Sequence, residues 1–317
     1  MQSVLILGAK GMLGQELVKS FSKKESYEVI AWDRDDFDVS DEKILREKVS
    51  DLWPDIILNA CAYNAVDVCE IDDEEYEKAK ILNTHVPGVL AEIAKDLRSI
   101  FVHYSTDYVF DGNRPQYRLG GRAPGCCGSG CSGCSYKSPS GKFDGYREND
   151  LPNPLSRYGM TKYEGEQKIE KVGDQYYIFR LSKLFGKSGF GNYSKQCFFE
   201  SIEKLAKTQN EVRVVDGEIS CFTYAPDLAL QTEKILSSGL AFGIYHLVNK
   251  GEETWYSATK KLFDEMGIHT KLTAVSPNEF KRNATRPERS VLVSTKIEAM
   301  RNWEEALKDY IKENKKV

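Results

Sequence analysis

The stretch "SVLILGAKGMLG", residues 3–14, decides the fold. A short apolar run ends in Gly8, glycines follow at positions 11 and 14, and apolar side chains then recur at helical spacing as far as Phe21. A strand that enters a glycine-rich turn and continues as a helix predicts the first unit of a dinucleotide-binding fold. The glycines permit a tight turn and let a pyrophosphate reach the free N–H groups of the helix. A plain strand-to-helix turn is the alternative. The candidate cofactor-binding residues here are Gly8, Gly11, Met12, Leu13 and Gly14.

Further apolar runs continue this pattern along the chain. We predict a helix over residues 86–97, in which Pro87 is tolerable only near the start or at a local break. The predicted strands cover residues 27–32, 55–60, 99–105 and 175–182. Apolar strands that alternate with helices predict a parallel sheet covered on both faces. The expected fold class is α/β, a doubly wound parallel sheet of the Rossmann type.

The regular alternation loosens after Ser182. Shorter elements follow, with helices predicted over residues 198–207, 225–236, 257–266 and 296–312 and a strand over residues 243–248. They predict a smaller C-terminal α/β region. We therefore divide the chain into a dinucleotide-binding domain over residues 1–182 and a mainly substrate-binding region over residues 183–317. Segments near residues 215–250 are expected to return to the Rossmann core.

The composition narrows the class of protein. The chain has 317 residues, a net charge of −4, 41% hydrophobic residues and 29% charged residues, as in ordinary globular proteins. A nucleic-acid-binding domain would carry clustered basic residues, which this chain lacks. No apolar run approaches the ~18 residues of a membrane span, and the first residues do not resemble a signal peptide. We expect a cytoplasmic protein that binds neither nucleic acid nor membrane.

Half of the eight cysteines lie close together in a Gly/Ser/Pro/Cys-rich segment, residues 113–142, which we interpret as an insertion. Its candidate metal ligands are Cys126, Cys127, Cys131 and Cys134, whose spacing suits an iron–sulfur cluster or a zinc ion. Adjacent cysteines are awkward ligands for one tetrahedral ion, so a redox-labile insertion without metal is the alternative. The remaining cysteines are expected to be reduced thiols: Cys61, Cys69, Cys197 and Cys221.

The end of the second strand bears on the choice of cofactor. An acidic residue there binds the ribose of NAD, whereas a nearby Arg suits the 2′-phosphate of NADP. Asp33 and Arg34 are adjacent, so the sequence leaves NADH and NADPH open. Asp38 and Val39 follow and are candidates for the edge of the adenine.

The spacing Tyr-x-x-x-Lys, which places both side chains on one helix face, occurs three times. A phenol beside a cation can act as the acid in a ketone reduction. Tyr76 and Lys80 lie in the acidic stretch "DDEEYEKAK", typical of a solvated helix, and Tyr256 is expected to pack at a helix start. Tyr158 and Lys162 lie between the fourth and fifth strands, and this position predicts that they reach the carboxyl edge of the sheet.

Two local features surround this pair. We expect Asn153 to cap the helix of Tyr158, with Pro154 in its first turn. The fourth strand ends in Ser105 and Thr106, whose hydroxyls can hydrogen-bond a developing alkoxide at the same edge.

In these motifs the chain resembles a known family. Outside residues 113–142 it is similar to the extended short-chain dehydrogenase/reductases, and among them to the dTDP-4-dehydrorhamnose reductase family. The resemblance rests on "GAKGMLG", "DFDVSD", "PDIILNACAYNAVDVCE", "STDYVFDG", "NPLSRYGMTKYEGE", "GIYHLVNKGEETWYSA" and "RPERSVLVSTK". It implies an NADPH- or NADH-dependent enzyme that reduces the C4 ketone of a nucleotide-linked 6-deoxy-4-keto sugar.

The resemblance also implies roles for individual residues. Tyr158 would donate the proton, Lys162 would bind the nicotinamide ribose and lower the Tyr158 pKa, and Thr106, with Ser105 as its substitute, would polarise the carbonyl. Residues implied to line the cofactor channel are Ala60, Ala62 and Tyr63, and residues implied to lie near the sugar are Asn64, Asp107, Tyr108, Ser182 and Lys183. A nucleotide sugar is the expected partner, and a homodimer stays open.

Four positions depart from the family pattern: Asn64, Lys183, Gly217 and Phe222. Because they are implied to touch or frame the sugar nucleotide, another nucleotide-linked 4-keto sugar stays an alternative substrate. Relatives of this fold also serve as cofactor-binding regulatory subunits, so a non-catalytic regulator is the second hypothesis. A metal or cluster function at the cysteines is the third.

Overall fold

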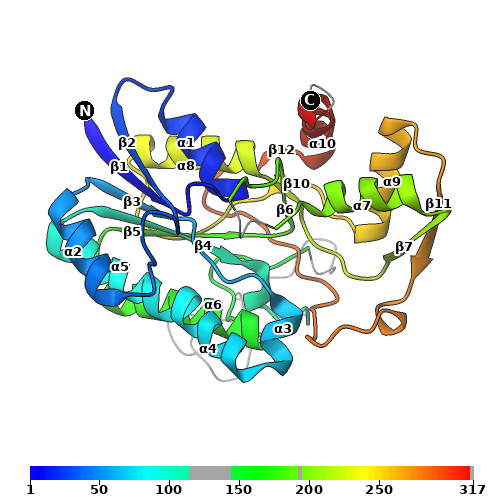
Figure 1. The fold of residues 1–317 in the computed structure, drawn as a ribbon, viewed down its shortest axis with the longest axis horizontal. Helices are drawn as coiled ribbons and strands as arrows, with labels where there is room; N and C mark the ends of the chain where they lie inside the picture. The colour runs from blue at the N-terminus through cyan, green and yellow to red at the C-terminus, as the bar shows by residue number, and fades with distance from the viewer. Residues whose placement is uncertain (114–143, 192–194, 315–317) are drawn as a thin grey trace, which may run out of the picture.

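Six parallel strands form the central sheet of the computed structural model, which describes residues 1–113, 144–191 and 195–314 (Figure 1). Their order is β2-β1-β3-β4-β5-β9. The strands are β1 (Gln2–Leu7), β2 (Tyr27–Trp32), β3 (Ile56–Asn59), β4 (Ile100–Thr106), β5 (Tyr176–Leu181) and β9 (Gly243–His246). Since all pairs are parallel, the carboxyl ends of these strands meet at one edge.

Helices cover both faces of this sheet (Figure 1). On one face lie α1 (Met12–Phe21) and α8 (Ala225–Ser238), which bury apolar side chains such as Leu17 and Leu228 against β1, β3, β4 and β5. On the other lie α2 (Glu42–Leu52), α5 (Val86–Leu97) and α6 (Arg157–Val172). The predicted doubly wound parallel sheet is therefore confirmed.

The last strand of the sheet comes from late in the chain. β9 pairs with β5 through Tyr177–Gly243 to Arg180–His246, and α8 packs beside α1. Both elements lie in the part of the sequence that we expected to return to the Rossmann core. The division into two domains at residue 182 stays a prediction.

A second core lies beyond the carboxyl edge of the sheet, at the right in Figure 1. It contains Phe199, Phe222, Leu262 and the fully buried Trp303. The helices here are α7 (Phe198–Thr208), α9 (Trp255–Met266) and α10 (Trp303–Asn314). Three short parallel pairs join them: β7 (Glu211–Val215) with β11 (Lys271–Val275), β6 (Leu184–Phe185) with β8 (Thr223–Tyr224), and β10 (Asn249–Lys250) with β12 (Met300–Asn302).

One predicted helix is wrong at its start. The helix expected over residues 296–312 begins only at Trp303, because Met300–Asn302 forms β12 and pairs with β10. The charged residues ahead of Trp303 fit a helical pattern, but the strand pairing with a segment some 50 residues away overrides that local preference.

Pro87 lies near the start of a helix, one of the two placements that the sequence left open. α4 (Asp73–Lys80) runs into a π-helical turn, η1 (Ile81–His85), and α5 follows with Pro87 in its first turn, where proline is tolerated. α3 (Val66–Ile71) precedes α4. Two 3₁₀ turns, η2 (Asp107–Val109) and η3 (Pro277–Glu279), complete the helical elements of the described chain.

In the described ranges, no helix is both long enough and apolar enough to cross a membrane. The same residues contain no cluster of three or more His, Cys, Asp or Glu side chains that could hold a metal ion. Cys61, Cys69, Cys197 and Cys221 are free thiols, as expected. The candidate metal ligands Cys126, Cys127, Cys131 and Cys134 lie outside the described residues, as does the insertion apart from Asn113.

Candidate active site

The turn between β1 and α1 has the shape that its glycines predict. Gly8 has a φ of +79°, and a Cβ on Gly14 would lie 2.0 Å from the Gly8 carbonyl oxygen. Gly11 caps α1 without a side-chain hydrogen bond to the first N–H groups, and no acidic residue lies in the first turn. These features fit a pyrophosphate at the start of α1. Met12 packs against the second core, and Leu13 is buried in the first.

The end of β2 reaches this turn. The Asp33 carboxylate accepts hydrogen bonds from the Lys10 N–H at 2.8 Å and the Arg34 N–H at 2.8 Å, while the Lys10 amine pairs with Asp35. A charged cluster therefore lies where the adenosine ribose is expected. Asp38 is exposed and accepts from the Ser40 N–H and hydroxyl. Val39 packs against the core below α2.

The segment after β3 is held by the π-helical turn. Asn83 accepts a hydrogen bond from the Tyr63 N–H at 2.9 Å and donates to the Tyr63 carbonyl at 3.1 Å and to the Thr161 hydroxyl at 3.1 Å. This amide connects the Tyr63 loop to α6. Ala60 and Ala62 are half-buried just before Tyr63 in the chain. The three candidate cofactor-channel residues therefore lie along one segment, which Asn83 holds by hydrogen bonds to Tyr63.

The helix that carries Tyr158 starts later than predicted. Asn153 does not cap it: the Asn153 amide donates to Asp111, and the Ser156 hydroxyl accepts from the Gly159 N–H at 3.1 Å. A Cβ on Gly159 would lie 2.4 Å from the Tyr108 carbonyl oxygen, so a glycine is needed for α6 to approach η2. This close contact brings Tyr158 to the end of β4.

The Tyr158 phenol is buried beside Thr106. Its ring packs edge-on against Tyr108, with centroids 6.0 Å apart. Burial raises the pKa of Tyr158, nearby Asp107 and Tyr108 raise it further, and hydrogen bonding with Thr106 opposes the rise. Desolvation of the phenolate is therefore the largest influence on the pKa of Tyr158. The lowering of this pKa by Lys162 stays a prediction.

The Lys162 amine points to the sheet. Nζ lies 2.7 Å from the Tyr104 carbonyl oxygen and 3.0 Å from His103 Nε2, and the side chain is 2% exposed. Burial lowers the pKa of Lys162 to about 8, while Glu166 one turn later opposes that shift. Lys162 can therefore exchange a proton near neutral pH.

The two hydroxyls at the end of β4 differ. Thr106 Oγ1 accepts from the Tyr108 N–H at 3.2 Å and donates to Asp107 at 3.2 Å, and it reaches Tyr158. Ser105 Oγ is buried with no hydrogen-bond partner among the described residues. The geometry favours Thr106 as the hydroxyl of the catalytic set.

Asp107 ties three segments together behind Thr106. Its carboxylate accepts from Ser182 at 2.9 Å and from Ser290 at 2.5 Å. Burial raises the pKa of Asp107, and these serine hydrogen bonds counteract the increase. Both Asp107 and Ser182 support the edge on which Tyr158 lies.

Lys183 occupies an unusual position for a cation. Its φ is +36°, and its amine lies 3.0 Å from the Glu218 carbonyl oxygen and 3.0 Å from that of Glu253. The amine also faces the rings of Trp255 and Phe222, 4.7 and 5.0 Å from their centroids. Burial lowers the pKa of Lys183 to about 8. Phe222 belongs to the second core, and Gly217 has a φ of +126° beside Pro277.

Several charged residues of this region were not predicted from the sequence. Arg286 pairs with Asp67 of α3 at 2.6 Å and lies near Tyr108, and Arg282 pairs with Glu218. Asp67 and Arg286 are 219 positions apart, so periodicity gives no sign of their contact. The motif "RPERSVLVSTK", which begins at Arg286, was the feature of the sequence that could have pointed to this residue. Lys195 donates to the Asn64 carbonyl at 3.0 Å, while the Asn64 side chain is exposed.

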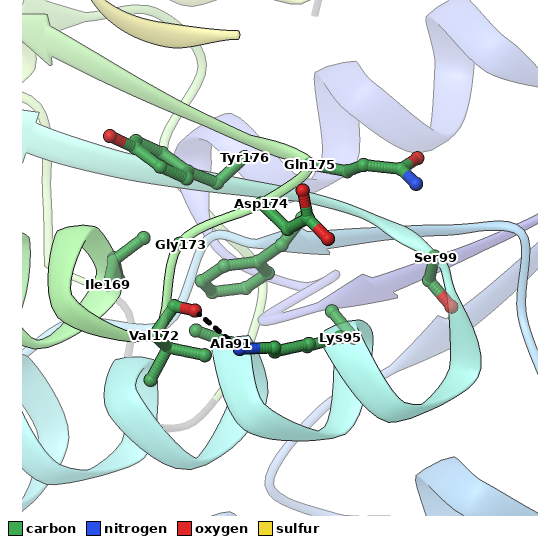
Figure 2. Close-up of a pocket in the computed structure, with 11 residues that line it drawn as sticks. Ala91, Lys95, Ser99, Ile169, Val172, Gly173, Asp174, Gln175 and Tyr176 are labelled. Carbon is green, nitrogen blue, oxygen red and sulfur yellow. Dashed lines mark hydrogen bonds between the residues drawn. The ribbon is translucent and has the colours of Figure 1, made fainter.

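A small pocket lies at the opposite end of the sheet (Figure 2). Across this pocket, the Lys95 amine of α5 donates a hydrogen bond to the Val172 carbonyl oxygen at 3.1 Å. Tyr176, the first residue of β5, lies beside the pocket. This place is at the amino ends of β4 and β5, and none of its lining residues is a candidate site residue. The candidate catalytic residues Thr106, Tyr158 and Lys162 lie at the other edge.

Comparison with known proteins agrees with this geometry. A family model described as the RmlD substrate binding domain matches residues 1–316. This chain belongs to that family. The family resemblance predicted from the motifs is thereby confirmed.

Two curated proteins match nearly the whole chain. The spore coat polysaccharide biosynthesis protein SpsK of Bacillus subtilis is 33% identical over 317 residues, covering 99% of this chain and 98% of that protein. The dTDP-4-dehydrorhamnose reductase of Aggregatibacter actinomycetemcomitans is 31% identical over 325 residues, covering 98% of each.

A solved structure has the same architecture. The dTDP-4-dehydrorhamnose reductase from Bacillus anthracis, in complex with NADP, superposes with a TM-score of 0.83 at 29% identity. The match covers 98% of this chain and 99% of that one. The doubly wound sheet and the smaller region beyond it are thus shared over the full length.

Proposed function

We propose that this protein reduces the C4 ketone of a nucleotide-linked 6-deoxy-4-keto sugar with NADPH or NADH, and that dTDP-4-dehydro-L-rhamnose is its substrate. The observation that carries the proposal is the buried Tyr158 phenol, which lies beside Thr106 and one helical turn before Lys162 at the carboxyl edge of the sheet. The names of full-length relatives at about one-third identity support the sugar.

The turn before α1 fits the cofactor. The tight turn, in which the Gly8 carbonyl leaves no room for a Cβ on Gly14, and the uncapped N-terminus of α1 suit a pyrophosphate. Asp33 and Arg34 at the end of β2 would contact the adenosine ribose, and Ala60, Ala62 and Tyr63 would line the path to the nicotinamide. When bound there, the nicotinamide supplies a hydride to the sugar C4.

Tyr158 would then supply the proton. A raised pKa keeps its phenol protonated at neutral pH, and a sugar alkoxide is a stronger base than a phenolate, so the proton moves from Tyr158 to the oxygen on C4. Thr106 would hydrogen-bond that oxygen as its charge grows. Lys162 would bind the nicotinamide ribose and stabilise the phenolate when protonated.

The sugar nucleotide would lie between this edge and the second core. Tyr108 and Lys183 would contact it, and the hydrogen bond between Ser182 and Asp107 would support that side of the site. Arg286 and Arg282 bring positive charge to the same side, which suits the diphosphate of a nucleotide sugar. We also propose a cytoplasmic location, where nicotinamide cofactors and nucleotide sugars are metabolites, and a mainly substrate-binding role for residues 183–317.

The test is an activity screen with purified protein, both cofactors and a panel of nucleotide-linked 4-keto sugars. We expect oxidation of the cofactor that depends on the sugar, with the 4-hydroxy sugar nucleotide as the product and dTDP-4-dehydrorhamnose as the best substrate. Tight cofactor binding without turnover of any sugar would contradict the proposal and favour a regulatory subunit.

A further inference from the structure

The short helix α3 lies against both tyrosines of the candidate site. Its Cys69 is 0% exposed and packs in a small apolar cluster with Tyr158. Val66 of α3 and the ring of Tyr108 border the same cluster. α3 also contacts α6, the helix that carries Tyr158. The mechanism proposed above assigns no task to α3.

The two carboxylates of α3 have partners in different parts of the chain. Asp67 and Glu70 are three positions apart, a spacing that makes side chains neighbours on one side of a helix. Asp67 binds a segment near the C-terminus, and Glu70 binds the start of α6. α3 therefore joins two segments that lie far apart in the sequence.

Asp67 uses both carboxylate oxygens to hold residues 283–286. Oδ1 accepts hydrogen bonds from the Asn283 N–H at 3.0 Å, the Ala284 N–H at 3.2 Å and Arg286 Nη1 at 3.0 Å. Oδ2 accepts from Arg286 Nη2 at 2.6 Å. The Arg286 hydrogen bond is the largest cause of the lowered pKa of Asp67. A bidentate pair of this kind fixes the plane of the guanidinium as well as its position.

The guanidinium of Arg286 is thereby oriented beside Tyr108. Arg286 also donates to the Ala284 carbonyl oxygen at 3.1 Å, so its bonds to Asp67 and Ala284 use three of its five N–H groups. The other two, on Nε and Nη2, form a second edge, a donor fork of the kind that binds phosphate oxygens. The side chain is 12% exposed and lies near Tyr108. Asp67 therefore sets the direction in which this second edge is turned.

Glu70 holds the backbone directly before the proposed proton donor. Its carboxylate accepts from the Arg157 N–H at 3.0 Å, and Arg157 is the first residue of α6. The first N–H groups of a helix have no partner inside the helix, and the helix dipole favours a carboxylate there. Because Tyr158 follows Arg157, Glu70 fixes the backbone from which the Tyr158 phenol extends.

We propose that α3 is a positioning element, in which Asp67 holds Arg286 toward the diphosphate of the sugar nucleotide and Glu70 holds the start of α6. The inference rests on the proposed function, which makes Tyr158 the proton donor and this edge of the sheet the sugar site. Since both carboxylates belong to one short helix, α3 sets the distance between the reacting phenol and the cation that binds the substrate.

The first test needs neither substrate nor turnover. Protein labelled with ¹³C,¹⁵N-arginine reports on both attachments by NMR, through hydrogen exchange of the Arg157 amide and rotation of the Arg286 guanidinium. Arg157→Lys and Arg286→Lys identify the signals. In the wild type we expect a protected Arg157 amide and two separate Nη resonances for Arg286, because Asp67 restrains the rotation. A fully exchanging Arg157 amide or a single Nη resonance for Arg286 overturns the proposal without any variant having to fold.

Each truncation on α3 should release only its own partner. Glu70→Ala should speed exchange of the Arg157 amide about 10-fold or more and leave the Arg286 resonances unchanged. Asp67→Ala should merge the two Nη resonances of Arg286 and leave exchange at Arg157 unchanged. Wild-type signals in both folded variants would overturn the proposal.

Asp73→Ala is the matched control. Asp73, at the start of α4, also pairs with an arginine, since its carboxylate lies 2.7 Å from Arg157 Nη1, but it is 90% exposed. It binds the side chain of Arg157 and not the N–H, so we expect the Arg157 amide and the Arg286 resonances to behave as in the wild type. Changes as large as those in the α3 variants would mean that the loss of any nearby charge suffices, which overturns the proposal.

Steady-state kinetics then separates positioning from a merely structural role. Asp67→Ala should raise the KM for the sugar nucleotide about 10-fold or more and change kcat little. Glu70→Ala should lower kcat about 10-fold or more and change this KM little. The Kd of the cofactor should stay near the wild-type value in both. Parallel changes of KM and kcat in the two variants overturn the proposal.

The two tests distinguish this inference from the proposed function. A wild type that has the expected arginine signals but turns over no sugar would contradict the proposed function and leave both attachments of α3 in place. Turnover of the sugar by a protein in which Arg157 and Arg286 are unrestrained would contradict only this inference.

Discussion

Tyr158–Lys162 and Tyr76–Lys80 share one spacing but occupy opposite environments. Lys162 is 2% exposed and bonds only inward, to His103 and the Tyr104 carbonyl, as far as the described residues show. Lys80 lies on the outer side of α4, pairs with Glu77 at 2.7 Å and lies 4.5 Å from the centroid of the Tyr76 ring. Burial lowers the pKa of Lys162, whereas the Glu77 hydrogen bond raises that of Lys80.

The comparison teaches that the spacing supplies only a shared helix face. The third pair supports this, since Tyr256 packs against the second core at the start of α9 while Lys260 is exposed. What distinguishes Tyr158 is the edge of the sheet to which α6 brings it, and the dehydration that this position imposes.

Replacing each tyrosine by phenylalanine should give the largest difference in kcat between the two pairs. Tyr158→Phe removes the proton donor, and kcat should fall about 10²- to 10⁴-fold while the dissociation constant of the cofactor changes little. Tyr76→Phe removes a hydroxyl on the outer helix and should leave kcat near the wild-type value. Equal losses in both variants would erase the distinction between the pairs.

The lysines should differ in the sign of their pH-dependent contribution to stability. A folded pKa of about 8 at Lys162, below the unfolded value of about 10.4, means that the unfolded chain binds more protons between these values. The stability of the wild type relative to Lys162→Met should therefore rise by about 3 kcal/mol as the pH increases through this window.

Lys80 supplies the opposite case. Its pKa is raised in the folded protein, so its contribution is present below the unfolded pKa and is lost as the pH rises through the folded one. Denaturant unfolding of wild type, Lys162→Met and Lys80→Met at neutral and alkaline pH measures both. A parallel pH course in the two variants would contradict the assigned burial of Lys162.

The close approach of α6 should be sensitive to a single methyl group. Gly159→Ala puts a Cβ against the Tyr108 carbonyl oxygen and should destabilise the fold by about 1–3 kcal/mol and lower kcat. Gly88→Ala on α5 is the matched change, since its Cβ would meet only the flexible Lys168 side chain. It should be neutral, or stabilising by up to about 1 kcal/mol. Similar stability losses would mean that backbone contact is not the cause.

The smallest effects come from the caps of the two helices. Ser156→Ala on α6 and Asp72→Ala on α4 each remove a capping oxygen and should each cost about 1 kcal/mol in the free energy of unfolding. Only Ser156→Ala should also change kcat, because α6 carries the proposed reacting pair, Tyr158 and Lys162, and α4 does not. A change in kcat with Asp72→Ala would link α4 to the site.

Much of the fold follows from local patterns. The glycines of residues 8–14, the apolar strands and the Tyr158 helix are encoded by neighbouring residues, and the structure has them. The cap of α6 was misassigned to Asn153 because Asp111, distant in sequence, engages that amide. The helix expected from residue 296 fails because β10 recruits residues 300–302 as a strand.

The site was predictable at its centre and not at its periphery. Tyr158, Lys162 and Thr106 could be placed because strand ends share one edge. The raised pKa of Tyr158 depends on its burial, and the Asp67–Arg286 pair depends on a contact between distant segments. His103 is hidden within the apolar strand "IFVHYST", where nothing local distinguishes it from a packed side chain.

The central claim is that this edge of the sheet carries out hydride reduction of a sugar ketone. Its most direct test follows the label from a nicotinamide cofactor deuterated at the transferred position, with dTDP-4-dehydrorhamnose and the wild-type protein. The account predicts one deuterium on C4 of the sugar in the 4-hydroxy product. A product without deuterium at C4, or bound cofactor with no product, would contradict it.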